Sequence, residues 1–191
     1  MASSIERQQW LENGVQALRE HFAGAGYTIP DNVRVSIGFP HGRGGKGKAI
    51  GQCWDSVAST DKHHEIFVSP ILAISSRVLG VLAHELVHAT VGVSAGHKGA
   101  FKQCALAIGL EGKMTATEES QEFRKWAGVF VATHGEYPAG ALNDATRKKQ
   151  STRLLKCECG ECGYVARVTS KWIEEAGAPL CPCNQEPMQT D

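Results

Sequence analysis

Residues 75–91 carry the strongest helical pattern in the chain, and this pattern restricts the fold more than any other feature of the sequence. Val78, Leu82 and Leu86 recur at the spacing of one helix face, with Leu79 beside them. This spacing predicts an amphipathic helix whose apolar stripe faces the core. Any polar side chain in the middle of such a helix therefore needs an explanation.

Three polar side chains of this helix, His84, Glu85 and His88, form the motif HExxH. Two histidines four residues apart project from one helix face, so both imidazoles can bind one Zn²⁺. Zinc lowers the pKa of bound water toward about 7, and Glu85 lies beside the two histidines, where it can take the proton of that water. The motif predicts hydrolysis of a peptide bond, with Glu85 as the catalytic residue that passes the proton to the leaving amine.

A catalytic zinc needs a third protein ligand. The metzincin extension of the motif requires Gly at 91 and His at 94, and the chain has Val91 and Ser94, which excludes that family. His97 follows Gly96 in a glycine-broken turn and opens the next predicted helix, so the spacing favours it as the third ligand. The alternatives are carboxylates that also fit solvated charges at helix ends, namely Glu111, Glu118 and Glu119.

Around this motif, periodicity predicts a mixture of helices and short strands. Apolar residues at helical spacing predict further helices over residues 4–23, 98–108 and 118–133. The last of these has Thr115 and Glu118 as a capping box at its start. Alternating patterns predict strands over residues 33–37, 50–54 and 65–68. Cys53 and Cys104 are interpreted as small core residues.

The cysteines are distributed unevenly, with five of the seven between residues 157 and 183. No apolar stretch resembles a signal peptide or reaches the ~18 residues of a membrane span, so we expect a cytoplasmic protein without a membrane partner. Clustered cysteines in a reducing cytoplasm are more often metal ligands than disulfides. The segment after residue 153 is also too short for an apolar core of its own, so it needs a metal to hold it together.

The spacing of these cysteines predicts a structural zinc site in a small ribbon. Cys159 and Cys162 form a CxxC pair, which lets two thiolates share one tetrahedral metal. Cys181 and Cys183 would supply the other pair across a hairpin, although ribbons usually carry CxxC there as well. The body of that hairpin is predicted at residues 165–168 and 171–173.

The charges balance overall, with 20 basic and 20 acidic residues, but they are not evenly spread. Between residues 140 and 173 only three acidic residues oppose seven basic ones, whereas the last part of the chain is acidic. A solvated linker and a strip that contacts nucleic-acid phosphates both account for this pattern. The basic residues of the strip are Arg147, Lys148, Lys149, Arg153, Lys156, Arg167 and Lys171.

The stretch HELVHATVGVSAGHKGAF resembles the active-site stretch of the SprT-like zinc metalloproteases, in which a histidine in a GH-(K/G)-x-x-F setting completes the HExxH site. Residues 51–54, 65–70 and 109–115 and the C-terminal LLKCECGECGYVARVTSKWIEEAGAPLCPC are also similar to small SprT-like proteins of phages and bacteria. The resemblance implies a compact zincin-like α+β fold, with the metal between two helices and a role connected with DNA-associated proteins, as in Spartan-type proteases.

The pattern of these SprT-like proteins has no cysteine at position 157. Cys157 is therefore interpreted as the one cysteine of the five that is not a zinc ligand, the alternative being that it replaces a ribbon ligand.

The sequence thus predicts a metalloprotease domain at residues 1–140 (a small sheet plus active-site helices), a basic linker at 141–153 and a β-rich zinc ribbon at 154–191. The expected function is a zinc-dependent endopeptidase with one catalytic and one structural Zn²⁺, targeted to DNA or DNA-bound proteins, in the host cytoplasm if a phage encodes it. The first alternative is a non-proteolytic zinc-binding protein on the same scaffold, associated with DNA or transcription. Hydrolysis of a small amide is a third hypothesis, which no deep-pocket signature supports.

Overall fold

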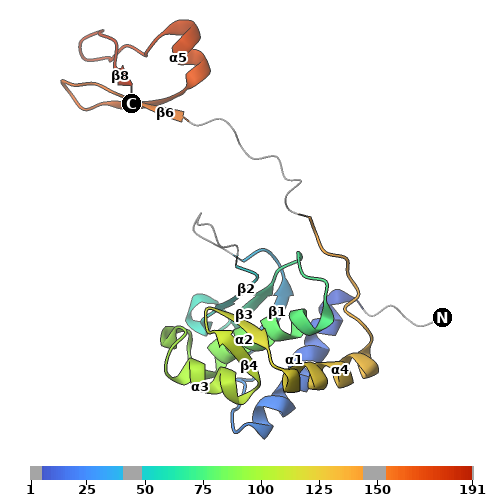
Figure 1. Ribbon diagram of the computed structural model, residues 1–191. Helices are drawn as coiled ribbons and strands as arrows, with labels where there is room; N and C mark the ends of the chain where they lie inside the picture. The colour runs from blue at the N-terminus through green and yellow to red at the C-terminus, as the bar shows by residue number, and fades with distance from the viewer. Residues whose placement is uncertain (1–5, 41–48, 144–153, 191) are drawn as a thin grey trace. The chain divides into compact units, whose positions relative to one another are not determined.

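The structure, a computed structural model, describes residues 6–40, 49–143 and 154–190 of the chain (Figure 1). The chain divides into two compact units, residues 1–144 and 145–191. Both units combine helices with small sheets, so the protein is mixed α+β. Within the described residues, every helix is too short or too polar to cross a membrane.

The first unit contains four α-helices, two short 3₁₀ turns and five strands among its described residues. In chain order these are α1 (Arg7–Gly24), β1 (Val33–Ile37), β2 (Gly51–Trp54), η1 (Ser56–Ala58), β3 (His64–Val68), α2 (Ser75–Val91), η2 (Val93–Ala95), α3 (Ala100–Ala107), β4 (Leu110–Lys113), β5 (Ala116–Glu119) and α4 (Gln121–His134). The three predicted strands and the helices predicted at residues 75–91 and 98–108 are confirmed within one or two residues. Of the helix predicted from residue 4, the part from Arg7 onward is confirmed, and residues 1–5 lie outside the described residues.

The main sheet has the strand order β1-β3-β2. The central strand β3 runs parallel to β1 and antiparallel to β2, so that Ile66 lies between Val35 on one side and Cys53 on the other. Ile66 is fully buried, as expected for the middle of the central strand. This arrangement leaves β2 at the edge of the sheet, next to α2.

Helix α2 is the centre of the first unit and contacts β2, β3, β5 and the three other α-helices (Figure 1). Large aromatic side chains from those helices fill the space around it: Trp10 and Phe22 of α1, Phe101 of α3 and Phe123 of α4 are fully buried. The indole of Trp10 also donates a hydrogen bond to the carbonyl of Gly135, at 2.9 Å, which fixes α1 against the end of α4. The predicted apolar stripe of α2 is therefore buried as expected.

The predicted helix start at residue 118 is wrong, because residues 116–119 form strand β5. This strand pairs antiparallel with β4, with Glu118 opposite Glu111. The hydroxyl of Ser120, rather than that of Thr115, caps α4 by accepting a hydrogen bond from the Phe123 N–H, at 3.2 Å. Exposed and buried residues alternate along β5, a period of two that the apparent capping box obscures.

The second unit is a small antiparallel sheet with one short helix. Its elements are β6 (Leu154–Glu158), β7 (Val165–Thr169), α5 (Ser170–Ala176) and β8 (Gln189–Thr190), in the strand order β7-β6-β8. The strand predicted at 165–168 is confirmed. The hairpin body predicted at 171–173 is wrong, because these residues belong to α5, which turns Ile173 toward the small core that contains Met188. Most of the predicted linker lies outside the described residues, including Arg147, Lys148, Lys149 and Arg153.

One glycine of α2 is required by the packing of β5. A Cβ built on Gly80 would overlap the carboxylate of Glu119, which is buried and bound to Arg77. The glycine in the middle of α4, Gly128, is exposed and has no atom within 4 Å of its corresponding Cβ position. The two residues therefore form a matched pair for a stability measurement.

We expect Gly80→Ala to lower the free energy of unfolding by about 2 kcal/mol, because overpacking costs more than the gain in helix propensity. Gly128→Ala should raise the same quantity by about 0.5–1 kcal/mol, because alanine is the better helix former in open space. Urea unfolding followed by circular dichroism measures both. A Gly80→Ala protein as stable as the wild type would contradict this account of the α2–β5 contact.

Candidate metal centres

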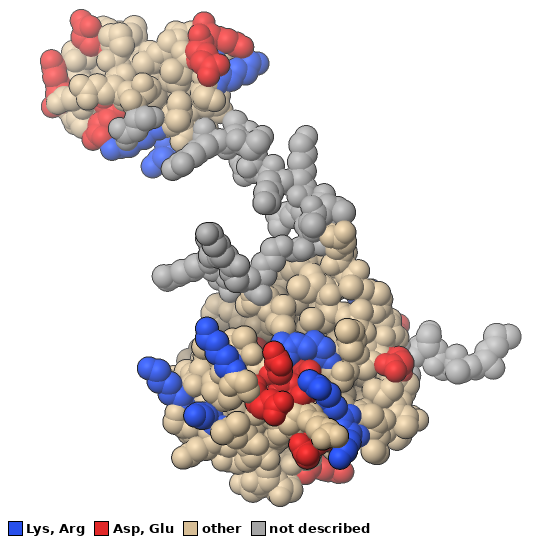
Figure 2. All heavy atoms as spheres, viewed as in Figure 1, with Lys and Arg blue, Asp and Glu red and all other residues tan. Residues whose placement is uncertain are grey.

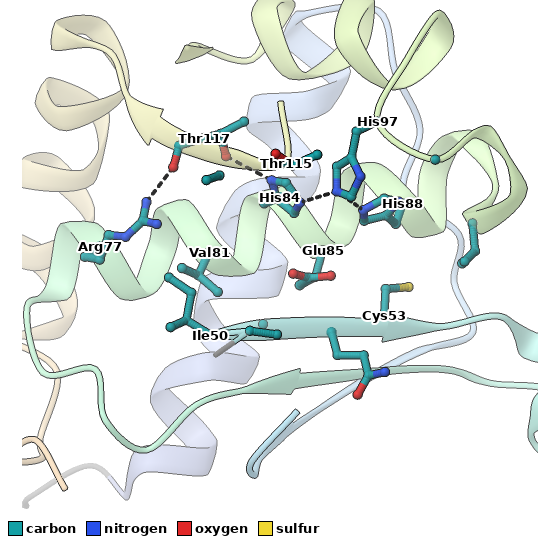
Figure 3. A pocket seen from close by; sticks show the side chains of 16 residues that line it. Ile50, Cys53, Arg77, Val81, His84, Glu85, His88, His97, Thr115 and Thr117 are labelled. Atoms are coloured by element: carbon teal, nitrogen blue, oxygen red, sulfur yellow. Dashed lines mark hydrogen bonds between the residues drawn. The ribbon is translucent and has the colours of Figure 1, made fainter. Parts of the chain in front are cut away.

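Three histidines of the first unit converge on one point (Figure 3). His84 and His88 extend from one face of α2, and His97 reaches them from the turn that precedes α3. The Nε2 atom of His97 lies 3.2 Å from that of His84 and 3.2 Å from that of His88. Nitrogen ligands about 2.0–2.1 Å from a tetrahedral zinc lie about 3.3–3.4 Å apart. This group can therefore hold a metal ion.

The environment of the three imidazoles keeps them neutral, as metal binding requires. Burial lowers the pKa of His84 to about 3, with a further contribution from the neighbouring histidines, and that of His88 to about 4. Burial also lowers the pKa of His97. The ring centroid of Phe101 lies 4.4–4.9 Å from those of all three imidazoles, so this ring fixes their packing.

The turn between α2 and α3 brings His97 back toward α2. Gly92 ends α2 with φ of 91°, and Gly96 directly before His97 has φ of 57°. Both values lie in the left-handed region, which glycine adopts without steric cost. The carboxylates considered as alternative ligands, Glu111, Glu118 and Glu119, belong to neither of the two groups that can hold a metal among the described residues.

Glu85 lies next to the three histidines, with its carboxylate against strand β2 (Figure 3). It is only 6% exposed, and it accepts a hydrogen bond from the backbone N–H of Cys53. A Cβ at Gly51 would lie 2.5 Å from its Oε1 atom, so glycine is what allows this strand to approach. Burial raises the pKa of Glu85 to about 8, and the Cys53 hydrogen bond partly opposes that shift.

These groups line one cleft of about 660 Å³, bounded by α2, β2, β5 and the turn before α3 (Figure 3). The predicted residues His84, Glu85, His88 and His97 all face it. Cys53, interpreted from the sequence as a core residue, both packs against the core and lines the cleft, whereas Cys104 is fully buried in α3. The remaining lining residues are Ala49, Ile50, Gly51, Gln52, Arg77, Val81, Val93, Gly96, Thr115, Ala116 and Thr117.

Four cysteines of the second unit form the other group. Cys181 Sγ lies 3.5 Å from that of Cys162 and 3.3 Å from that of Cys183, and Cys159 Sγ lies 3.7 Å from that of Cys183. Thiolates about 2.3 Å from a tetrahedral zinc lie about 3.8 Å apart, so the cluster fits such an ion closely. These four residues can hold a metal ion.

The two halves of the cysteine cluster have similar backbones, although one is CxxC and the other CxC. In the first half the N–H of Gly163 donates to the carbonyl of Cys159, at 3.0 Å, and in the second the N–H of Gln185 donates to that of Cys181, at 2.8 Å. The backbone N–H of Cys162 lowers the pKa of Cys159 to about 7, which favours the thiolate. Cys157 is fully buried in β6 and lies outside the group of four.

Comparisons of the chain with protein-family models, with curated proteins and with solved structures find no match. The chemistry of the chain is therefore inferred from its own residues. The sequence did not predict the contributions of Gly51, Arg77 and Thr117 to the cleft. The only sequence signal for Thr117 is the alternation along β5.

We expect the purified protein to contain two metal ions per chain, one in each group. His88→Ala should remove the first ion alone, because it leaves two imidazoles, and Cys162→Ser should remove the second alone. Elemental analysis by plasma mass spectrometry, calibrated against protein concentration, measures the stoichiometry. Loss of both ions in either variant would contradict two independent sites.

Proposed function

We propose that this chain is a zinc-dependent endopeptidase of the SprT-like type. The observation that carries the proposal is the meeting of three imidazole nitrogens and the Glu85 carboxylate in one open cleft. His84, His88 and His97 would hold the ion, a set of three protein ligands that leaves one position open for substrate or water. The zinc, when bound, would polarise the scissile carbonyl and acidify water.

In this proposal Glu85 is the catalytic residue. It takes a proton from the attacking water and delivers it to the leaving amine. Its position supports the role, because the carboxylate lies next to the three histidines and lines the same cleft (Figure 3). The carboxylate lies directly against Gly51 of β2, so the strand limits the positions that it can take.

A peptide substrate suits the cleft better than a small amide. β2 pairs with β3 along one edge, and Gly51, Gln52 and Cys53 of the same strand line the cleft. An extended peptide can join the edge of a sheet through main-chain hydrogen bonds. The helix with the motif, the small sheet and the second helix that follows His97 are also the parts expected of a zincin-like domain, with residues 1–140 as its extent.

The zinc ribbon, residues 154–191, is proposed to bring this domain to DNA or to DNA-bound proteins. Of the predicted basic strip, the structure describes Lys156, Arg167 and Lys171. Lys156 pairs with Glu158, while Arg167 is exposed. Basic and acidic side chains are interspersed on the face of this unit that Figure 2 shows, so contacts with phosphates would be few and local.

Two exposed aromatic side chains support contact between the ribbon and unpaired bases. Tyr164 is 51% and Trp172 is 54% exposed, and the ammonium of Lys171 lies 5.2 Å from the centroid of the Trp172 ring. Base stacking on aromatic rings combined with basic side chains is the usual means of binding single strands. Cysteines that serve as metal ligands also suit a cytoplasmic protein.

We expect Glu85→Gln to lower the rate of substrate cleavage by about 10²–10⁴-fold, because the amide cannot accept the proton. Metal content should be unchanged. Cleavage of fluorescein-labelled casein, with and without single-stranded DNA, measures the rate. Glu118→Gln, which changes an exposed carboxylate of β5, is the matched control and should keep wild-type activity.

The same experiment separates the protease from the non-proteolytic alternative. A zinc-loaded wild-type protein that cleaves nothing, and whose DNA binding is unchanged in Glu85→Gln, would favour a DNA- or transcription-associated binding protein. A Glu85→Gln protein that cleaves as fast as the wild type would refute the catalytic role.

For the ribbon, we expect Arg167→Ala to weaken binding of a fluorescent single-stranded oligonucleotide and to reduce the slope of log K against log[salt] by about 0.7, the contribution of one phosphate contact. Fluorescence anisotropy across a salt titration measures both. Arg124→Ala, at an exposed position of α4, is the control. Equal slopes for the wild type and Arg167→Ala would exclude this contact.

A further inference from the structure

We propose that Thr117 is a positioning residue for the metal ligand His84, and that β5 is fixed on α2 for this purpose. The inference rests on the proposed function, because it takes the three histidines as the zinc site. It adds a residue outside the HExxH motif, on a hairpin that the sequence did not predict.

The two ring nitrogens of His84 have different partners. Its Nε2 atom faces the other two imidazoles, and its Nδ1 atom lies 2.9 Å from the hydroxyl oxygen of Thr117 (Figure 3). A neutral imidazole that gives the Nε2 lone pair to a metal carries its proton on Nδ1. The Thr117 hydroxyl therefore accepts this N–H and fixes both the tautomer and the rotation of the ring.

Without that acceptor, the Nδ1–H group of His84 would be left without a hydrogen-bond partner in a buried place. Thr117 is only 3% exposed, so little water reaches this contact. A buried donor left without a partner costs about 1–3 kcal/mol. His88 shows the contrast, because its buried Nδ1 atom has no hydrogen-bond partner among the described residues. Of the two motif histidines, His84 is thus the one that a protein hydroxyl orients.

Thr117 is itself held in place by a side chain of α2. Arg77, two turns before His84 on α2, donates from Nη1 to the Thr117 carbonyl at 2.8 Å and to Glu119 Oε1 at 2.6 Å. Glu119 is only 6% exposed and lies against Gly80 of the same helix. Arg77 of α2 therefore binds β5 on both sides of residue 118, at the backbone of Thr117 and at the side chain of Glu119. In turn, the Thr117 hydroxyl of β5 binds His84 of α2.

These contacts connect α2 and β5 at two places: Arg77 binds β5, and β5 binds His84 of the same helix. Helix and strand cannot shift relative to each other by one residue without breaking the Arg77 and Thr117 contacts together. Removing the residue that hydrogen-bonds to a metal-bound histidine typically weakens metal binding by about 10–100-fold. An apolar side chain at position 119 would have sufficed for packing. The need to hold Arg77, and through it Thr117, explains why this buried residue is an ion-paired glutamate.

The test compares two substitutions of Thr117 in the full chain. Thr117→Val keeps the size and branching of the side chain but removes the hydroxyl, whereas Thr117→Ser keeps the hydroxyl and removes the methyl group. Competition with a chromophoric zinc chelator measures the affinity of the histidine site, and the Cys159–Cys183 cluster serves as an internal reference. We expect about 10–100-fold weaker zinc binding for Thr117→Val and a change of less than about threefold for Thr117→Ser.

Two spectroscopic measurements separate positioning from packing. The visible bands of the Co²⁺-loaded histidine site should shift in Thr117→Val and not in Thr117→Ser. In the zinc-loaded wild type, NMR of the imidazole nitrogens should find the His84 proton on Nδ1 and exchanging slowly with water. This last measurement needs no variant, and a His84 ring proton that exchanges rapidly with water would contradict the Thr117 hydrogen bond even if Thr117→Val fails to fold.

Three outcomes would overturn the proposal. The first is wild-type zinc affinity in Thr117→Val, and the second is equal loss in the valine and serine variants, which would indicate packing alone. The third is a His84 ring proton on Nε2 in the zinc-loaded protein. A wild-type histidine site that binds no zinc would refute the metalloprotease proposal as well, whereas the first two outcomes leave that proposal intact.

Discussion

The first unit depends on one constraint, the burial of a helix that carries polar groups in its middle. Helix α2 is packed between β2, β3, β5 and the other α-helices of the first unit, so outside the cleft its polar side chains have little access to water. Each unpaired polar group at this depth costs about 1–3 kcal/mol. Glu85 meets this requirement with the backbone of β2, and His84 does so with a hydroxyl of β5. The Nδ1 atom of His88 has no hydrogen-bond partner among the described residues, and the Nε2 atoms of the three histidines converge on one point, where a single metal ion could bind all three.

Two glycines make this enclosure physically possible. Gly51 lets the backbone of β2 reach the Glu85 carboxylate, and Gly80 gives the Glu119 carboxylate a place against α2. At both positions a methyl group would take the space that a carboxylate oxygen now fills. The two carboxylates nevertheless differ in role. Glu119 is paired with Arg77, whereas burial raises the pKa of Glu85.

The HExxH motif predicted His84, Glu85 and His88, and the glycine-broken turn favoured His97 over the carboxylates; all four residues line the cleft. Periodicity in the sequence was sufficient to predict α2 and the three strands of the main sheet. It failed over residues 110–119, where each strand has only four residues and Thr115 with Glu118 imitates a helix cap. The roles of Thr117 and Gly51 could not be predicted, because they arise from contacts between segments more than thirty residues apart.

The strand order of the main sheet also governs how the chain can assemble during synthesis. β1 and β2 both pair with β3, which comes last of the three, so neither has its partner until residues 64–68 exist. α2 begins at Ser75, and the sheet and the helix that covers it therefore become available almost together. His97 and then Thr117 follow later in the chain. A nascent chain that ends between them already has its three imidazoles, but it still lacks the hydroxyl that orients the first.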